Sequence, residues 1–72
     1  MKVPKLTPVK SSNIQSVGHN DYGLFVRFAG GGLYSYPGAP KSLYDQMVEA
    51  ESVGKFFRAK VSGKFAHRQH DA

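Results

Sequence analysis

Histidine is the residue type in this chain best suited to acid–base chemistry near neutral pH, and three are present: His19, His67 and His70. A nucleophilic or general-base centre needs several such groups brought together. Cysteine is absent, and the carboxylates nearest in sequence are Asp21 and Asp71. His19 lies at a predicted turn and the other two lie near the C-terminal end, so no such centre is indicated. We expect the protein not to be an enzyme and to need no cofactor.

Two short motifs resemble ligand-binding motifs. The spacing His67-x-x-His70 offers two metal ligands, but structural zinc usually takes four, so solvated histidines are the favoured interpretation. Residues 30–32 are three glycines, as in a phosphate-binding loop, but they lack the Lys-Ser/Thr that follows in a P-loop. No helix is expected to begin there either. A hairpin turn is the better interpretation, and no metal site is predicted.

Aromatic and basic side chains alternate along two predicted strands. By the period of two, Phe25 and Arg27 share one face of the strand over 24–29, and Tyr34 and Tyr36 share one face of the next strand. If all four lie on one exposed face, they form an aromatic-basic platform on which RNA bases could stack. The alternative is that both tyrosines pack beneath helices as core residues. The sequence leaves both interpretations open.

A second candidate surface is basic. Residues 52–70 carry five basic residues and no acidic one, whereas residues 39–51 are net negative. Lys55 and Arg58 share a helix face opposite the two phenylalanines between them. A solvated helix face is the ordinary explanation, but five bases without an acid favour an anionic partner, either nucleic acid or an acidic protein surface. The candidate partner-binding residues are Phe25, Arg27, Tyr34, Tyr36, Lys55, Arg58, Lys60 and Lys64.

The strands that must position these side chains form an antiparallel meander. Asn-Asp-Tyr-Gly and the three glycines supply the turns between them. Ile14 and Val17 are three residues apart, so a bulge or an edge position is needed to place both on one face. The predicted strands cover residues 14–19, 24–29, 33–36 and, as a short fourth strand, 64–67.

Two helices are predicted between the third and fourth strands. The helix over 41–50 begins after Pro40, and the helix over 52–61 has Ser52 as its N-cap. Each has an apolar stripe that must be buried. We therefore predict an α+β fold, with three or four antiparallel strands and both helices packed on one face. The aliphatic face of the strand over 24–29 is the better candidate for that cover.

The 72 residues allow one domain with a small core. The net charge is +5, and the N-terminus lacks the apolar segment of a signal peptide. No apolar run approaches the roughly 20 residues of a membrane span, so we expect a cytoplasmic protein without membrane contact. The predicted organisation is a mobile basic arm over 1–10, a folded domain over 11–66 and a frayed tail over 67–72.

Four short motifs follow one another along the chain: Ser-Ser-Asn-Ile at 11–14, Gly-Leu-Tyr-Ser-Tyr at 32–36, Ala-Glu-Ser-Val-Gly-Lys-Phe-Phe at 50–57 and Val-Ser-Gly-Lys-Phe at 61–65. With this order and the central Tyr-x-Tyr, residues 11–66 resemble the KTSC domain, a family named for its occurrence at the C-terminus of some lysyl-tRNA synthetases. His19 and Arg58 depart from the family pattern, which often has an aromatic residue and Asn there. For this family RNA binding has been suggested.

The resemblance and the small size lead to two hypotheses. The chain also resembles the very small phage-encoded regulators that bind bacterial RNA polymerase. The first hypothesis is therefore a non-enzymatic regulator that binds the polymerase, inhibits host transcription initiation and promotes antitermination. An exposed strand such as 14–19, or the sheet face, would accept a polymerase peptide. The alternative is an RNA- or single-strand-nucleic-acid-binding module that uses the aromatic-basic face. We expect a monomer in either case.

Overall fold

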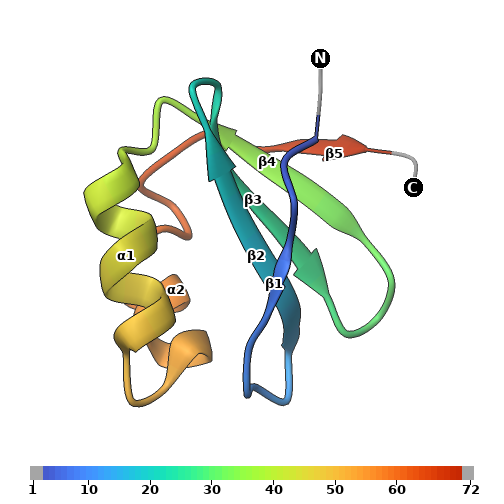
Figure 1. Ribbon diagram of the computed structural model, residues 1–72, viewed down its shortest axis with the longest axis vertical. Helices are drawn as coiled ribbons and strands as arrows, with labels where there is room; N and C mark the ends of the chain where they lie inside the picture. The colour runs from blue at the N-terminus through green and yellow to red at the C-terminus, as the bar shows by residue number, and fades with distance from the viewer. Residues whose placement is uncertain (1–2, 71–72) are drawn as a thin grey trace.

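The computed structural model describes residues 3–70, in which a five-stranded sheet lies against two helices (Figure 1). Every pair of neighbouring strands is antiparallel, and the strands lie in the order in which they occur in the chain. This confirms the predicted α+β class, with five strands in place of three or four. The elements are β1 (Thr7–Pro8), β2 (Ile14–Asn20), β3 (Gly23–Phe28), β4 (Leu33–Pro37), α1 (Lys41–Glu49), α2 (Val53–Lys60) and β5 (Arg68–His70).

The first additional strand lies in the segment predicted to be a mobile arm. Thr7 and Pro8 pair with Val17 and Ser16 of β2, so the arm is held to the sheet at these residues. The prediction of a mobile arm over 1–10 is therefore wrong there. Thr7 and Pro8 show no apolar alternation, so the sequence gives no reason to predict a strand there. The strand forms because the edge of β2 offers backbone groups for pairing. Residues 1–2 lie outside the described part of the chain.

The second additional strand lies in the segment predicted to be frayed. β5 pairs with β4, with Leu33 opposite His70. The frayed tail predicted over 67–72 is therefore wrong for 68–70, and residues 71–72 lie outside the described residues. The strand predicted over 64–67 is also wrong, since these residues form a turn and an irregular connection. A polar strand of three residues shows no alternation of apolar and polar side chains that could predict it. Its position is set by the edge of β4, with which its backbone pairs.

A bulge in β2 places Ile14 and Val17 on the same face, as the sequence predicted. The register with β3 shifts between Ile14 and Ser16, so that Ile14 stands opposite Phe28 and Val17 opposite Val26. Both residues of β2 are fully buried in the core. The extra residue changes the local alternation and turns both side chains toward the helices.

The turns at both ends of β3 depend on backbone conformations that favour glycine. In the β3–β4 hairpin, the Phe28 N–H donates to the carbonyl oxygen of Gly32 over 2.8 Å, and Gly31 has φ +105°. At the start of β3, Gly23 has φ +152°, and a Cβ there would collide with the backbone carbonyl of Tyr36. The three glycines thus form a hairpin turn, as predicted.

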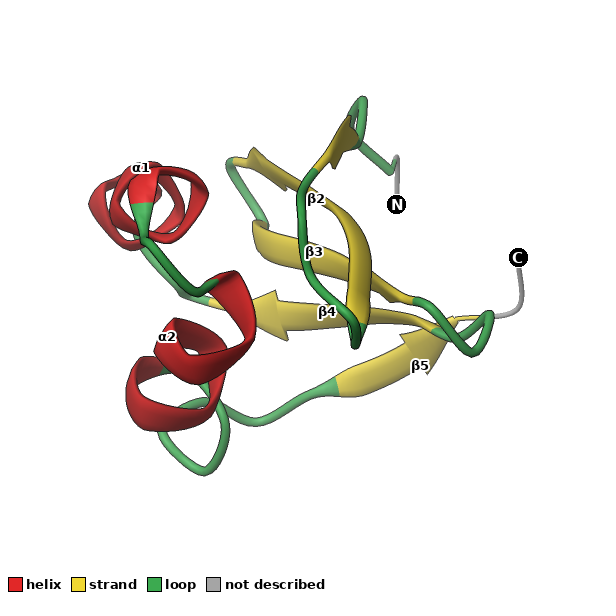
Figure 2. Ribbon diagram, turned by 90° about the horizontal axis from the view of Figure 1, so that it is seen from below, coloured by secondary structure: helices red, strands yellow, loops and turns green. Residues whose placement is uncertain are grey.

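Both helices pack on one face of the sheet, as Figure 2 shows from the end of the molecule. The Ser52 side chain accepts a hydrogen bond from the Lys55 N–H over 3.3 Å, which confirms the predicted N-cap of α2. No helix in the described part of the chain is long and apolar enough to cross a membrane. The core between the layers consists of Ile14, Val17, Leu24, Val26, Tyr36, Ala39, Met47, Val53, Phe57 and Val61.

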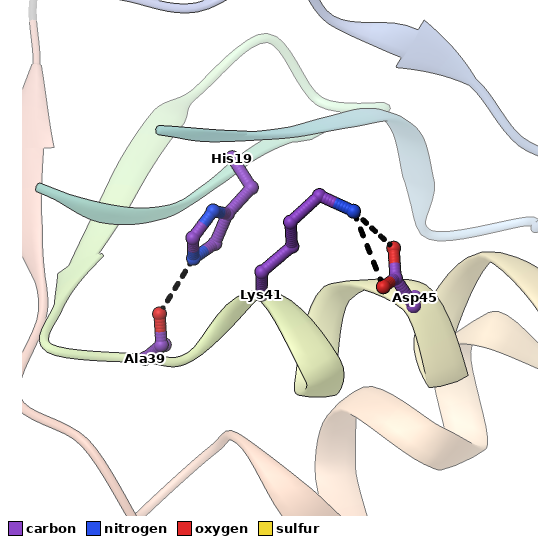
Figure 3. Close-up of polar contacts among 4 residues, drawn as sticks. All are labelled: His19, Ala39, Lys41 and Asp45. Carbon is purple, nitrogen blue, oxygen red and sulfur yellow. Dashed lines mark hydrogen bonds and ion pairs between the residues drawn. The ribbon is translucent and has the colours of Figure 1, made fainter. Parts of the chain in front are cut away.

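His19 connects the end of β2 to the beginning of α1 (Figure 3). Its Nε2 lies 2.7 Å from the carbonyl oxygen of Ala39, and the imidazole ring lies 6.1 Å from the ring of Tyr44. Because a carbonyl oxygen can only accept, Nε2 carries the proton and donates it. The side chain therefore has a structural contact on the helix-covered face.

Candidate ligand-binding groove

Tyr34 and Tyr36 lie on the face of the sheet that the helices cover. In the register of β3 and β4 they stand opposite Val26 and Leu24, and directly opposed residues share a face. Tyr36 is 5% exposed and belongs to the core, while Tyr34 is half-buried. The interpretation that the tyrosines pack beneath the helices is therefore correct for Tyr36, and Tyr34 keeps an accessible ring.

Phe25 and Arg27 lie on the opposite face. They pair with Ser35 and Leu33, and Phe25 is fully buried. The predicted platform of Phe25, Arg27, Tyr34 and Tyr36 is therefore wrong. Alternation within each strand was read correctly, but the hairpin register decides which residues of neighbouring strands share a face.

The face that bears Phe25 is closed by β5 and by the turn before β3. The Phe25 ring lies 5.9 Å from the rings of both Tyr22 and His70. His70 Nε2 is 2.6 Å from the hydroxyl of Ser35, a residue with no exposed surface. His70 is therefore part of a packed polar contact, which corrects the prediction of a solvated histidine at this position.

The N-terminal segment closes the rest of this face. A Cβ on Gly18 would lie 2.7 Å from the carbonyl oxygen of Lys5 and 2.9 Å from a methyl carbon of Leu6. Residues 4–6 therefore pack directly on β2, with the Lys5 carbonyl oxygen at a distance that only glycine allows. Among the described aromatic residues of this face, Phe25 is fully buried, and Tyr22 and His70 are half-buried against it.

His67 and His70 do not form a ligand pair. The His67 ring lies 5.4 Å from the ring of Tyr34 and 6.1 Å from that of Tyr36, whereas His70 contacts Ser35. Tyr34 and Ser35 are adjacent in β4 and face opposite sides of the sheet, so the two imidazoles do as well. Among residues 3–70 no cluster of three or more metal-ligating side chains is present.

A groove of about 720 Å³ opens on the helix-covered face, where β4, the end of α2 and the connection to β5 meet. Figure 2 shows this connection leaving the helix layer and running to β5 beside β4. None of the described acidic residues lines the groove. Six of its lining residues carry aromatic rings, and the others are glycine or neutral polar residues: Phe28, Tyr34, Tyr36, Phe57, Phe65 and His67, with Gly30, Gly32, Ser62, Gly63 and Gln69.

Four of these rings hold one another in edge-to-face contacts. Phe28 is 5.4 Å from Tyr34 and 5.5 Å from Phe57, with the ring planes at 83° and 80°. Tyr36 is 5.5 Å from Phe57, at 74°. Each such contact stabilises the pair by about 0.5–1.5 kcal/mol beyond the area it buries. The wall of the groove is therefore ordered before any ligand arrives.

Glycines form the hairpin side of the groove. A Cβ on Gly32 would lie 2.9 Å from Cε1 of Tyr34, so the absence of a side chain lets the tyrosine ring lie against the hairpin. Gly63 follows α2 with φ +79° and turns the chain toward β5. The sequence predicted the hairpin turn at residues 30–32, but it carried no signal that Gly32 or Gly63 borders a groove.

Tyr36 contributes a neutral hydroxyl. Burial, with a smaller contribution from the neighbouring Tyr34, raises the pKa of Tyr36 from 10.0 to about 12. No hydrogen bond joins this hydroxyl to another described residue, and no described side chain has a buried polar atom without a partner. The hydroxyl therefore reaches the groove surface, where it can donate to or accept from a ligand.

The predicted basic residues divide into two groups around this groove. Arg58 lies in a hollow that shares Phe28 and Phe57 with the groove. Lys60 and Lys64 lie in a hollow between the two helices, which shares Phe65 with the groove. Lys55 lies elsewhere, beside Glu51, and Arg27 is on the other face of the sheet. Arg58, Lys60 and Lys64 therefore border the groove, because each lines a hollow that shares a lining residue with it. Lys55 and Arg27 lie away from the groove.

Comparison with known proteins gives the family. Residues 10–65 match the sequence model of the KTSC domain. The chain belongs to the KTSC domain family. A protein of Tsukamurella paurometabola is 36% identical over 62 residues, which is 83% of this chain and 92% of that protein. The crystal structure of a KTSC domain protein from Yersinia pestis superposes with a TM-score of 0.87 at 33% identity, over 93% of this chain and 97% of that one.

In this KTSC domain, three of the four motifs that carry the resemblance meet at the groove. The segment 32–36 supplies both tyrosines, 50–57 supplies Phe57, and 61–65 supplies Ser62, Gly63 and Phe65. The fourth, 11–14, supplies Asn13 and Ile14 to the adjoining hollow. Sequence reasoning missed Phe28, Phe57, Phe65 and His67 as groove residues. The aromatic residues within these motifs were an available signal for Phe57 and Phe65, whereas Phe28 and His67 lie outside the motifs.

Proposed function

We propose that the protein is a non-enzymatic module that binds single-stranded nucleic acid in the aromatic groove. The observation that supports this most directly is the lining itself, with six aromatic rings and none of the acidic side chains that the structure describes. Stacking of a base on an aromatic side chain is worth about 1–3 kcal/mol and tolerates any base. A binding surface of this composition suits unpaired bases, whose faces are free to stack.

The exposure of the rings assigns them different roles. Tyr34 is half-buried and His67 is exposed, with their rings 5.4 Å apart, so these two offer the most accessible surface for a base. Tyr36 lies deeper, and its hydroxyl is placed to hydrogen-bond a base edge or a sugar. The glycines of the hairpin allow the backbone of a strand to approach closely. Paired bases in a duplex are stacked on one another and would not enter.

The charge of the molecule suits the same ligand. The net charge is +5, and Arg58, Lys60 and Lys64 border the groove and are exposed. Phosphates of a bound strand would displace counterions near these side chains, so affinity should fall linearly with salt on logarithmic axes.

The experiment that tests the proposal is an NMR titration of isotope-labelled protein with mixed-sequence single-stranded RNA and DNA oligonucleotides at low salt. We expect amide shifts at Gly30, Gly32, Ser62 and Gly63, which line the groove. Tyr34→Ala should weaken binding by roughly tenfold or more, the equivalent of one lost stacking contact, and Tyr34→Phe should restore it.

The matched control is Tyr22→Ala, which removes a half-buried tyrosine from the other face of the sheet. It should leave the affinity unchanged, provided that thermal unfolding shows a folded protein. If neither oligonucleotide moves the groove amides, or if Tyr22→Ala weakens binding as much as Tyr34→Ala, the proposal is wrong.

A second candidate is the phage-type regulator of bacterial RNA polymerase, acting as a monomer in the host cytoplasm. The observation that favours it is that β5 is an edge strand of the described sheet and contains the exposed basic residue Arg68. An acidic extended peptide of the polymerase could pair with this edge. Titration with purified polymerase subunits should then shift the amides of residues 68–70, and an unchanged spectrum would exclude this mode of binding.

A further inference from the structure

A second hollow adjoins the aromatic groove on the side of α2. It has a volume of about 370 Å³ and is lined by Asn13, Ile14, Phe28, Gly54, Phe57 and Arg58. Phe28 and Phe57 line both this hollow and the groove, and their rings are in edge-to-face contact at 5.5 Å. The two cavities therefore share one aromatic pair as a common wall, and a ligand that crosses this pair lies in both.

The polar groups of this hollow suit an anion. Arg58 is exposed, and the single ion pair among the described residues joins Lys41 to Asp45, so Arg58 is not engaged by a carboxylate. Asn13 supplies a side-chain amide, and none of the described acidic residues lines the hollow. A guanidinium binds a phosphate through two parallel hydrogen bonds, which makes Arg58 the best phosphate ligand near the groove.

The wall opposite α2 is held in place by local contacts. The Ser11 hydroxyl accepts hydrogen bonds from the N–H groups of Asn13 and Ile14, over 3.2 and 3.3 Å. The carbonyl oxygen of Asn13 accepts from the Ala29 N–H over 2.8 Å. A Cβ on Gly54 would lie 3.3 Å from the Ser11 hydroxyl oxygen, so the turn at 11–13 rests directly on α2. The position of Asn13 relative to Arg58 is thereby set by the fold.

The other basic residues are less suited to the same role. Lys60 and Lys64 lie in a hollow that shares a single residue, Phe65, with the groove. Lys55 lies beside Glu51 in a cavity that shares none of its lining with the groove. Arg27 projects from the opposite face of the sheet.

We propose that the bound strand crosses the Phe28–Phe57 pair and that Arg58, with Asn13, holds one of its backbone phosphates. The inference rests on the proposed function and adds the path that the bound nucleic-acid strand takes across the protein surface. Bases occupy the groove at Tyr34 and His67, and the backbone leaves it beside α2. Arg58 thereby acts as a phosphate ligand that sets the register of the strand on the protein.

The test is fluorescence anisotropy of a labelled single-stranded oligonucleotide, with affinity measured from about 50 to about 200 mM salt. For single strands each neutralised phosphate contributes about 0.7 to the slope of log affinity against log salt. Arg58→Gln should therefore lower the slope by about 0.7 and weaken binding by roughly tenfold at low salt, the loss expected for a hydrogen bond to a charged group. Arg58→Lys should keep the slope and recover part of the affinity.

The matched control is Arg27→Gln, which removes the same charge from the other face and should leave the slope unchanged. If Arg58→Gln binds with the wild-type slope, or if Arg27→Gln lowers the slope equally, the assignment of Arg58 is overturned while binding in the groove stands. If the wild-type protein binds no single strand, the proposed function itself fails. If an acidic protein segment binds at Arg58 and no oligonucleotide binds, the proposed function and the assignment of Arg58 are both overturned.

Discussion

The two faces of the sheet use alternate residues of the same strands but differ in how they are covered. On one face, Phe25 and Ser35 are fully buried beneath the N-terminal segment, β5 and the turn before β3. On the other face two helices cover the strands, yet Phe28 and Tyr34 remain half-buried and line an open groove. The larger covering layer therefore leaves an open corner beside its closed core.

The difference follows from the shape of the covering elements. Extended chain can lie directly on a sheet, as residues 4–6 do on Gly18. A helix is a cylinder about 10 Å across, so two short helices cannot follow a twisted sheet to its corner. Here α2 ends at Lys60, and an irregular connection bridges the remaining distance to β5. The groove is the space left at that corner, so the open aromatic cavity belongs to the helix-covered face.

The largest expected effect tests the closed face. Phe25→Ala removes a fully buried ring and should lower the free energy of unfolding by about 3–5 kcal/mol, measured by urea denaturation. Phe65→Ala, at the half-buried wall of the groove, should cost clearly less. Equal losses in the two variants would show that the faces do not differ in packing.

A smaller effect tests the polar contact of the closed face. His70→Ala leaves the buried Ser35 hydroxyl without its partner and should lower stability by about 1–3 kcal/mol. Adding Ser35→Ala to this variant removes the orphaned hydroxyl and should recover part of the loss. A double-mutant cycle on unfolding free energies measures this coupling, and strictly additive effects would contradict the contact.

The next effect concerns the open face and appears only at alkaline pH. The pKa of Tyr36 is about 12 in the folded protein and about 10 in an unfolded chain. Between these values the folded protein keeps a proton that the unfolded chain has released, so stability is intact below pH 10 and falls as the pH rises toward 12. Tyr36→Phe cannot ionise and should lose less stability over this range, as followed by thermal unfolding. Parallel pH profiles for both proteins would contradict the raised pKa.

The smallest effect concerns a surface that belongs to neither face of the sheet. The Lys41–Asp45 ion pair joins two exposed side chains on the outer surface of α1, 3.1 Å apart (Figure 3). Lys41→Ala should change the unfolding free energy by less than about 0.5 kcal/mol, because exposed pairs are screened by water and salt. It should leave oligonucleotide binding unchanged as well. A large effect on either measurement would mean that α1 contributes to the binding surface.

Local patterns predicted most of the regular structure. The alternation of Leu24 and Val26 predicted the covered face of β3, the three-residue spacing of Ile14 and Val17 predicted a bulge, and Ser52 was identified as an N-cap. Each of these signals depends on residues close in sequence. The short strands at Thr7–Pro8 and Arg68–His70 could not be found in this way, because their stability comes from an edge supplied by another part of the chain.

For the candidate site, the residue types were predicted better than their arrangement. Tyr34, Tyr36 and Arg58 were all identified, but the partners assigned to the tyrosines, Phe25 and Arg27, lie on the other face. The sequence by itself determined the α+β class, the aromatic and basic composition of the site and the glycines that its turns require. Only the tertiary structure decided which rings share a surface, because strand register and the end of α2 bring together residues 28, 34, 57 and 67.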